Sequence, residues 1–329
     1  MKIGFWTTLV VAFTFARPGA VSAQQYDPDM LGTFSIIALD PATGEIGMGV
    51  QSKAFAAGNR AVAVKGGVAA IAHQASANPM YATVGFELLA AGMTPKDALD
   101  FMLRADEGRD RRQVVILDIQ GRSAGWSGPG TNDWKGHHCG NNYCAQGNIL
   151  AGPRVVDAMA KSFESSTGPL AERLMAALDA AQAAGGDARG MQSGALMVTR
   201  PLGGSGGFSD RVLDIRVDDH RTPLVELRRI LNLWRSGQVL SQANQQLKAG
   251  DTKAAVATAQ KAVDMAPSSD NAWIALAHMR LRAGQWPGVF EALQRAVALN
   301  PTARQTLQRN QNFESVRETP EFQKIVGGQ

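Results

Sequence analysis

The chain has 329 residues, of which 45% are hydrophobic and 19% are charged. This composition excludes an intrinsically disordered protein, which combines low hydrophobicity with high net charge. The formal net charge of +4 comes from the two ends of the chain, and no dense Lys/Arg cluster occurs. Nucleic-acid binding therefore lacks its main electrostatic driving force. No apolar run is long enough for a membrane-spanning helix, and the length predicts about two domains.

The first 23 residues have the pattern of a secretory signal peptide. Lys2 is followed by the apolar run Phe5–Ala16, and Val21-Ser22-Ala23 supplies the small residues of a cleavage site. An uncleaved membrane anchor is the alternative, but this run is too short to span a bilayer. We predict cleavage after Ala23, a periplasmic or secreted protein, and a short pro-segment or linker at 24–32.

The sequence contains two cysteines, Cys139 and Cys144. In an exported protein, a nearby pair of this kind predicts a disulfide, with free thiols as one alternative. A zinc site that uses His137, His138 and Cys139 is another, although the spacing matches no standard zinc motif. We expect no metal and no cofactor.

In the first part of the mature chain, strand-like segments come in neighbouring runs and helix-like segments come in pairs. Thr33–Leu39 and Ile46–Val50 lie on either side of the turn-forming segment Asp40–Gly44 and predict a β-hairpin. Further strands are expected at 61–64, 68–72, 113–119, 123–127, 193–199 and 211–217. Helices are expected to begin near 79 and 95 and to span 153–163, 169–184 and 223–234. Neighbouring strands and paired helices predict an α+β fold of antiparallel sheets covered by helices over residues 33–234.

Residues 235–329 have a helical pattern that repeats. Three landmarks recur at an offset of 34 residues: Gly250 as Gly284, Ala262 as Ala296, and Pro267 as Pro301. This offset is the tetratricopeptide period, in which helical hairpins bury their apolar faces by stacking. Coincidence among alanine-rich helices is the alternative. We predict a C-terminal all-α domain of tetratricopeptide-like repeats.

The candidate nucleophile is Thr33, at the start of the first predicted strand. A threonine at a free N-terminus can use its own α-amine, which titrates near pH 8, as a general base. Lys53 follows the second strand of the hairpin and is expected near Thr33, where its charge would lower the pKa values of the amine and the hydroxyl. The sequence has no nucleophile elbow, phosphate-binding loop or zinc-protease motif.

Several segments carry a resemblance to a known family: Thr33-Phe34-Ser35-Ile36 with Asp40-Pro41-Ala42-Thr43-Gly44, Gln74 with Asn78-Pro79, the run Gln146–Gly152, and Arg211 to Asp219-His220. Together they resemble domain of unknown function 1028, a bacterial family grouped with the N-terminal-nucleophile (Ntn) hydrolases. The resemblance covers roughly 33–234. It implies a four-layer αββα sandwich.

The resemblance also assigns expected roles to individual residues. Thr33 would be the nucleophile and Ser35 a second hydroxyl beside it. Gln146 and Asn148 would stabilise an oxyanion or hold a substrate amide, unless they form a turn before the next helix. The remaining candidates for substrate contact are His73, Gln192 and Ser193, each of which has a purely structural alternative.

These features predict an exported Ntn-type amidohydrolase that cleaves a C–N bond of a small amide or peptide. The mechanism requires a cut between Gly32 and Thr33, because the Thr33 amine must be free. The alternative is a non-catalytic binding module of the cell envelope, whose helical repeats dock a protein or peptide partner. Homo-oligomers are compatible with the sequence, and neither nucleic acid nor a membrane span is expected.

Overall fold

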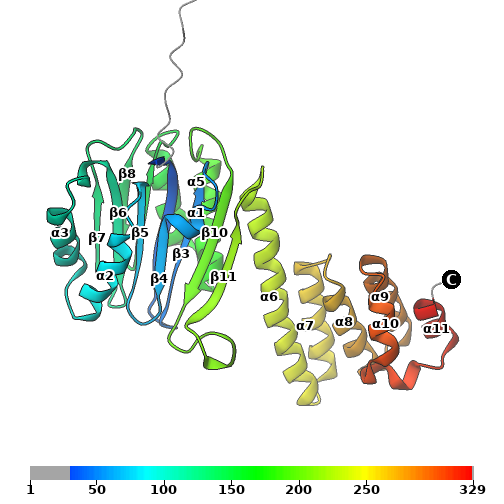
Figure 1. Cartoon of the computed structure of the whole chain (residues 1–329). Helices are drawn as coiled ribbons and strands as arrows, with labels where there is room; N and C mark the ends of the chain where they lie inside the picture. The colour runs from blue at the N-terminus through cyan, green and yellow to red at the C-terminus, as the bar shows by residue number, and fades with distance from the viewer. Residues whose placement is uncertain (1–29, 328–329) are drawn as a thin grey trace, which may run out of the picture.

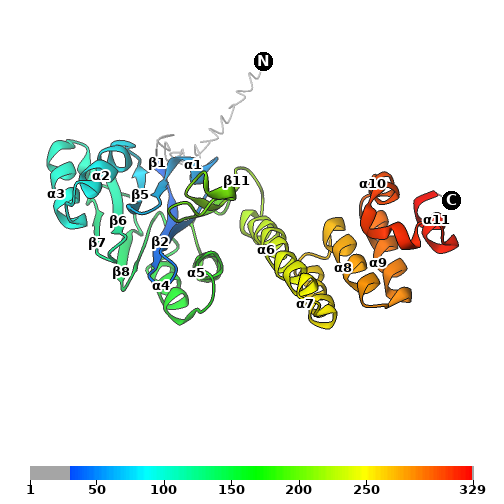
Figure 2. The same ribbon diagram turned by 90° about the horizontal axis from the view of Figure 1, so that it is seen from below.

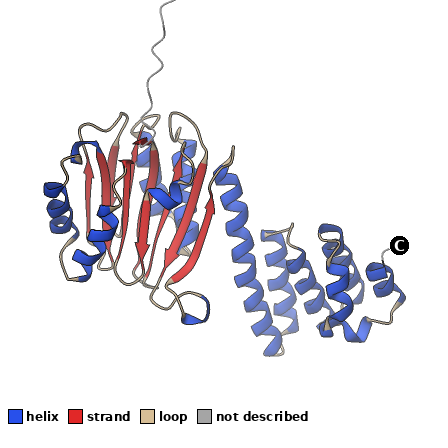
Figure 3. Cartoon of the chain, viewed as in Figure 1, coloured by secondary structure: helices blue, strands red, loops and turns tan. Residues whose placement is uncertain are grey.

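The computed structural model of this chain describes residues 30–327 (Figures 1 and 3). The predicted signal peptide and most of the predicted pro-segment lie outside the described residues. Within 30–327, no helix has the length and apolar character needed to cross a membrane.

The strands described within 30–327 form two antiparallel sheets. The first sheet has the order β1 (Met30–Leu31), β5 (Ala69–Ser76), β6 (Arg112–Asp118) and β7 (Ser123–Ser127), with β4 (Val62–Lys65) also paired to β5. The second sheet has the order β11 (Arg211–Val217), β10 (Ser193–Thr199), β3 (Glu45–Ser52), β2 (Thr33–Asp40), β9 (Tyr143–Asn148) and β8 (Gly136–Gly140). The expected hairpin is present as β2 and β3, joined by a turn at 41–44.

The two sheets stack face to face, and helices cover both outer faces (Figure 2). Because side chains alternate along a strand, Ile37 packs between the sheets while Phe34 and Ile36 pack against helices. The covering helices are α2 (Met80–Ala90) and α3 (Pro95–Ala105) on the first sheet, and α4 (Arg154–Ser165) and α5 (Leu170–Ala183) on the second. The architecture is mixed α+β, as expected, with layers in the order helices, sheet, sheet, helices.

One hairpin, β8–β9, was not anticipated from the pattern of residues 136–148. Cys139 and Cys144 lie opposite each other in it and form the predicted disulfide, with an S–S distance of 2.03 Å. Gln146 and Asn148 therefore lie on a strand, which corrects the alternative that placed them in a turn. The disulfide also withdraws Cys139 from the zinc alternative, and within 30–327 no group of three or more His, Cys, Asp or Glu side chains could hold a metal ion.

A long helix, α6 (Pro223–Lys248), connects the sandwich to the helical C-terminal region (Figure 1). Its first turns bury Leu227 and Leu231 against the second sheet, whereas Ala243 packs on the helix that follows. The helix was expected to end at 234, so the predicted domain boundary at 234/235 falls inside it. The apolar spacing continues past this boundary because the first half of α6 packs in the core of the second sheet and its second half packs in the core of the C-terminal helices.

The C-terminal helices are paired in sequence order. After α6 come α7 (Thr252–Met265), α8 (Asp270–Arg282), α9 (Trp286–Leu299), α10 (Ala303–Arg309) and α11 (Pro320–Gly327). Gly250 and Gly284 follow α6 and α8 with φ of 84° and 70°, a left-handed conformation that favours glycine at helix ends. The 34-residue offset in the sequence therefore corresponds to equivalent turns in the pairs α6–α7 and α8–α9.

Candidate functional site

Thr33 begins β2 at the end of the sandwich where the chain crosses from one sheet to the other. Residues 30–31 pair with β5 in the first sheet, and residue 33 starts β2 in the second sheet. Thr33 shares the inter-sheet face of β2 with Ile37 and is fully buried. In register, Ser52 of β3 lies on one side of it and Asn148 of β9 on the other.

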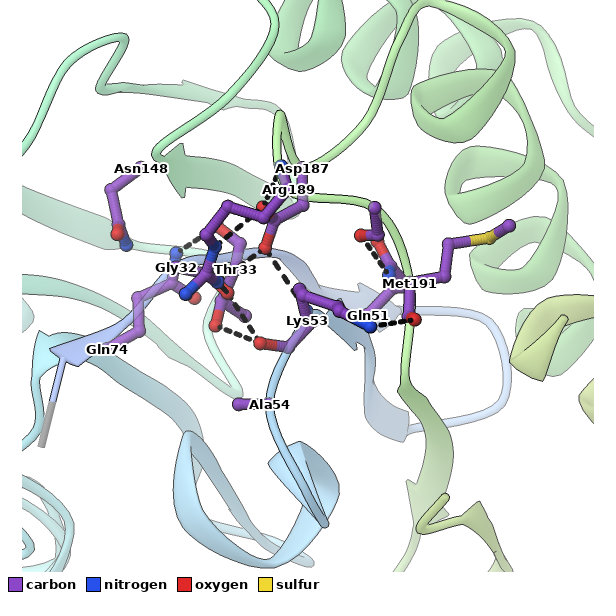
Figure 4. A network of polar contacts seen from close by, with 12 residues as sticks. Gly32, Thr33, Gln51, Lys53, Ala54, Gln74, Asn148, Asp187, Arg189 and Met191 are labelled. Atoms are coloured by element: carbon purple, nitrogen blue, oxygen red, sulfur yellow. Dashed lines mark hydrogen bonds and ion pairs between the residues drawn. The ribbon is translucent and has the colours of Figure 1, made fainter. Parts of the chain in front are cut away.

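The hydroxyl of Thr33 is connected to the peptide carbonyl that precedes it. Thr33 Oγ1 donates a hydrogen bond of 3.0 Å to Ser52 Oγ, and Ser52 Oγ donates one of 2.5 Å to the Gly32 carbonyl oxygen (Figure 4). Arg189 Nη2 donates to the same carbonyl oxygen at 2.7 Å. The carbonyl of the Gly32–Thr33 peptide bond is thus polarised by a hydroxyl and a guanidinium cation.

Arg189 is fixed in place by Asp187, on the loop between α5 and β10. Arg189 Nε lies 3.0 Å from Asp187 Oδ1, and Nη2 lies 2.7 Å from Oδ2, a bidentate ion pair (Figure 4). The Asp187 side chain is fully buried and also accepts the Lys53 backbone N–H at 3.1 Å. Sequence reasoning missed this pair. Its one visible trace is Asp-Ala-Arg inside a glycine-rich loop.

Buried polar side chains continue from Thr33 into the space between the sheets. Gln74 Nε2 donates to the Thr33 carbonyl oxygen and to Gln113 Oε1, both at 2.9 Å. Ser35 Oγ donates to Gln74 Oε1 at 2.7 Å, and Asn148 Nδ2 donates to Gln113 Oε1 at 3.1 Å. These five residues are fully buried. Such a cluster is costly in a core unless its hydrogen bonds are made.

Two buried acceptors in this region lack a partner among residues 30–327. They are Asn148 Oδ1 and Gln146 Oε1, and Gln146 points its amide nitrogen to the Ala72 carbonyl at 3.3 Å. Buried side-chain oxygens normally accept a hydrogen bond. The structure therefore brings the predicted residues Ser35, Gln146 and Asn148 together around Thr33 and leaves acceptor capacity there.

Lys53 has a different position from the one expected. It follows Ser52, the residue opposite Thr33, as the hairpin register predicted. Its side chain is exposed, however, and Nζ donates to the Met191 carbonyl at 3.3 Å (Figure 4). Because adjacent strand residues face opposite ways, Ser52 rather than Lys53 contacts the Thr33 hydroxyl.

The other predicted contacts lie at the edge of the site or outside it. Ser193 is opposite Ser52 in register, but its hydroxyl donates to the Ala54 carbonyl at 2.6 Å. Gln192 Nε2 donates to Asp219 Oδ1 at 3.1 Å. In the uncut chain, both side chains therefore connect neighbouring loops and strands.

His73 does not join the site, which corrects the prediction. It precedes Gln74 on β5 and shares the face of Ile71, which packs against α2 and α3. The ring is 5% exposed, and burial lowers the pKa of His73 to about 4 because the charged form loses its hydration. His73 is therefore a neutral core residue at pH 7.

The sequence profile of the family of unknown function DUF1028 matches residues 33–227. The chain belongs to the DUF1028 family. The DUF1028 protein SPO2555 from Silicibacter pomeroyi has a crystal structure that is similar to this chain, at 30% sequence identity and a TM-score of 0.56. That similarity covers 61% of this chain and 84% of SPO2555. A search of curated proteins gave no match. The DUF1028 region coincides with the sandwich and ends within α6.

Proposed function

We propose that this DUF1028 chain is an exported amidohydrolase of the Ntn type, which cleaves a C–N bond of a small amide or peptide through an acyl-enzyme on Thr33. The layer order, helices–sheet–sheet–helices, is the one that the Ntn resemblance implies. A disulfide between Cys139 and Cys144 is typical of an oxidising compartment and supports export.

The observation that carries the proposal is the chain of contacts from Thr33 Oγ1 through Ser52 Oγ to the Gly32 carbonyl. In the processing step, Thr33 Oγ1 attacks the Gly32 carbonyl carbon, while Ser52 and Arg189 stabilise the developing oxyanion. The Gly32–Thr33 C–N bond breaks, and the hydroxyl proton passes to the departing Thr33 nitrogen. Water then hydrolyses the resulting ester and leaves Thr33 as the N-terminus.

The mature site would work by the same steps on an external substrate. The free Thr33 amine takes the hydroxyl proton as Oγ1 attacks the substrate carbonyl, and returns it to the leaving amine. Asn148 Oδ1 and Gln146 Oε1, the buried acceptors described above, would accept N–H groups of the new amine or of the substrate. Gln74 would hold the Thr33 main chain through its carbonyl.

Intact mass and N-terminal sequencing of the protein exported from a bacterial host test the proposal. We expect the wild-type chain and Thr33→Ser to begin at residue 33, whereas Thr33→Ala keeps the preceding residues and has no amidase activity. Thr43→Ala, at the exposed turn of the same hairpin, is the matched control and should process normally. A wild-type chain that begins at Gln24, or a Thr33→Ala chain that hydrolyses an identified substrate at the wild-type rate, contradicts the proposal.

A binding module is the second candidate, and the helical region beyond the DUF1028 match favours it. Helices α7–α11 lie outside residues 33–227, and their 34-residue period is that of tetratricopeptide repeats, which commonly bind peptides. This candidate predicts an uncut Gln24 terminus and a saturable partner whose binding survives Thr33→Ala. Loss of residues 236–329 should abolish that binding.

A further inference from the structure

We propose that the substrate of this site is a glycyl amide: an extended peptide or N-acylglycinamide in which the carbonyl attacked by Thr33 belongs to glycine. The inference rests on the proposed function and adds the substrate class to it. It follows from how the site holds residues 30–32.

The processing step and substrate turnover pass through the same kind of covalent intermediate. When Thr33 Oγ1 attacks the Gly32 carbonyl and the C–N bond breaks, the product is an ester between Gly32 and Thr33. A substrate with a glycyl carbonyl gives the identical ester, releases its amine, and is hydrolysed by the same water. Residues 30–32 therefore mark the position that the acyl side of a substrate would occupy.

This position has no room for a side chain at the residue that is attacked. A Cβ atom built on Gly32 would lie 2.2 Å from Arg189 Nη2 and 2.9 Å from Ile149 Cδ1, shorter than real contacts of a Cβ atom. The Arg189 side chain cannot swing away freely, because Asp187 holds it at both Nε and Nη2 and it is 15% exposed. Ile149 directly follows β9 and is 8% exposed.

Arg189 couples this size restriction to catalysis. The guanidinium group that donates to the attacked carbonyl is the same group that covers the Cα of Gly32. A larger acyl residue can enter only by displacing Arg189, and the displaced cation no longer stabilises the oxyanion. An alanyl substrate should therefore lose rate as well as binding.

The pairing of β1 indicates an extended backbone on the acyl side. Residues 30 and 31 pair antiparallel with Ser76 and Ala75 of β5. The same edge of β5 is occupied further along by β4, from Val62 to Lys65. Once the processed segment leaves, the edge of β5 at Ala75 and Ser76 loses its strand partner, and a peptide substrate can add there as a strand.

The test compares two fluorogenic substrates that differ by one methyl group, N-acetyl-Met-Leu-Gly- and N-acetyl-Met-Leu-Ala-7-amido-4-methylcoumarin, with the exported full chain. We expect kcat/KM to be at least about 10-fold higher for the glycyl substrate, the discrimination a tight pocket gives against one methylene. In parallel, Gly32→Ala should slow processing by at least about 10-fold. Gly237→Ala, where an added Cβ meets nothing within 4 Å, should process at the wild-type rate.

The outcomes separate this inference from the proposed function. If a chain that begins at Thr33 cleaves both substrates at similar rates, or cleaves neither, the glycyl inference is wrong and the hydrolase proposal stands. Rapid processing of Gly32→Ala also contradicts the inference. If the wild-type chain does not begin at Thr33, the proposed function is wrong, and the inferred substrate class is then wrong as well.

Discussion

At the scale of single residues, the candidate site depends on a carboxylate that does not touch the reacting atoms. Asp187 is buried, holds both Nε and Nη2 of Arg189, and accepts the Lys53 backbone N–H. It is therefore a positioning residue: it aims the Arg189 guanidinium at the Gly32 carbonyl. Losing a buried charge leaves its partner without compensation, which costs more than the pair contributes.

Asp187→Asn should slow processing at Gly32–Thr33 and lower the free energy of unfolding by about 3 kcal/mol. Arg189→Lys, which keeps the charge but loses the bidentate geometry, should slow processing while it destabilises less. Intact mass over time and urea unfolding measure the two effects. Asp100→Asn removes an exposed pair with Lys96 and should leave the free energy of unfolding nearly unchanged. Equal effects of Asp187→Asn and Asp100→Asn would contradict the positioning role.

His73 predicts a pH dependence of stability that is separate from the site. The folded chain protonates His73 only near pH 4, whereas the unfolded chain protonates it near 6.5. The unfolded state thus binds more protons in this pH range. The contribution of neutral His73 to the free energy of unfolding is fully present above pH 6.5 and is lost as the pH falls toward about 4. The loss amounts to about 3 kcal/mol.

Urea unfolding of the wild type and of His73→Leu between pH 8 and pH 4 measures the contribution of His73 to the free energy of unfolding. The difference in unfolding free energy between the two proteins should change little from pH 7 to 8, where His73 is neutral in the folded state and mostly neutral in the unfolded state. Below pH 6.5 the variant should lose about 3 kcal/mol less than the wild type. A difference that stays constant down to pH 4 would show that His73 does not control this dependence.

At the scale of elements, glycines in β3 allow α5 to pack directly on the second sheet. A Cβ on Gly47 would lie 2.6 Å from the Met197 carbonyl oxygen and 3.1 Å from Leu174 Cδ1 of α5. A Cβ on Gly49 would lie 3.1 Å from Leu178 Cδ1 of the same helix. The one residue between them, Met48, faces the other sheet, so these two glycines set the distance between β3 and α5.

Two glycine-to-alanine substitutions should have opposite effects on stability. Gly47→Ala overpacks the contact with β10 and α5 and should cost about 1–3 kcal/mol. Gly237→Ala, in the middle of α6 with open space around it, should stabilise the chain by about 0.5–1 kcal/mol because alanine favours the helix. Thermal unfolding monitored by circular dichroism measures both. Stabilisation by Gly47→Ala would mean that α5 and the sheet can move apart.

At the scale of the whole molecule, α6 joins two cores without a flexible linker. Leu224, Leu227 and Leu231 belong to the core beneath the second sheet, and Ser236 donates to the Ala262 carbonyl of α7 at 3.0 Å. Ion pairs from Arg228 and Arg235 to Glu172 tie α6 to α5 as well. The sandwich therefore needs the first half of α6, and the helical region needs the second.

Two truncations should separate these roles. A chain that ends at Gly237 keeps the leucines and ion pairs of the first half of α6, so it should fold and process like the full chain. A chain that ends at Thr222 loses Leu224, Leu227 and Leu231, each worth about 1.5–3 kcal/mol on burial, and should be unfolded. Circular dichroism and intact mass distinguish the two. Normal processing of the shorter chain would show that α6 is dispensable for the sandwich.

The sequence by itself determined the features that depend on local patterns. Two β-rich runs on either side of Asp40–Gly44 specified the β2–β3 hairpin, and the 34-residue offset located equivalent helix turns at Gly250 and Gly284. A nearby cysteine pair in a chain with a predicted signal peptide favoured the disulfide over free thiols and a zinc site, and the structure contains it. The short, glycine-rich strands β8 and β9 carry little apolar alternation, and for that reason their hairpin was missed.

Only the tertiary structure decided which polar side chains meet at Thr33. Arg189 lies 157 positions from Gly32 in the chain, and Gln74 and Gln113 come from the other sheet, so no local spacing encodes their convergence. In the structure, His73 lies on the helix-covered face of β5, and the Lys53 side chain contacts Met191 rather than Thr33. The physical reason is that a local pattern identifies a strand, whereas β2 is buried on both faces. The stacking of the two sheets and the helices selects the residues that each face contacts.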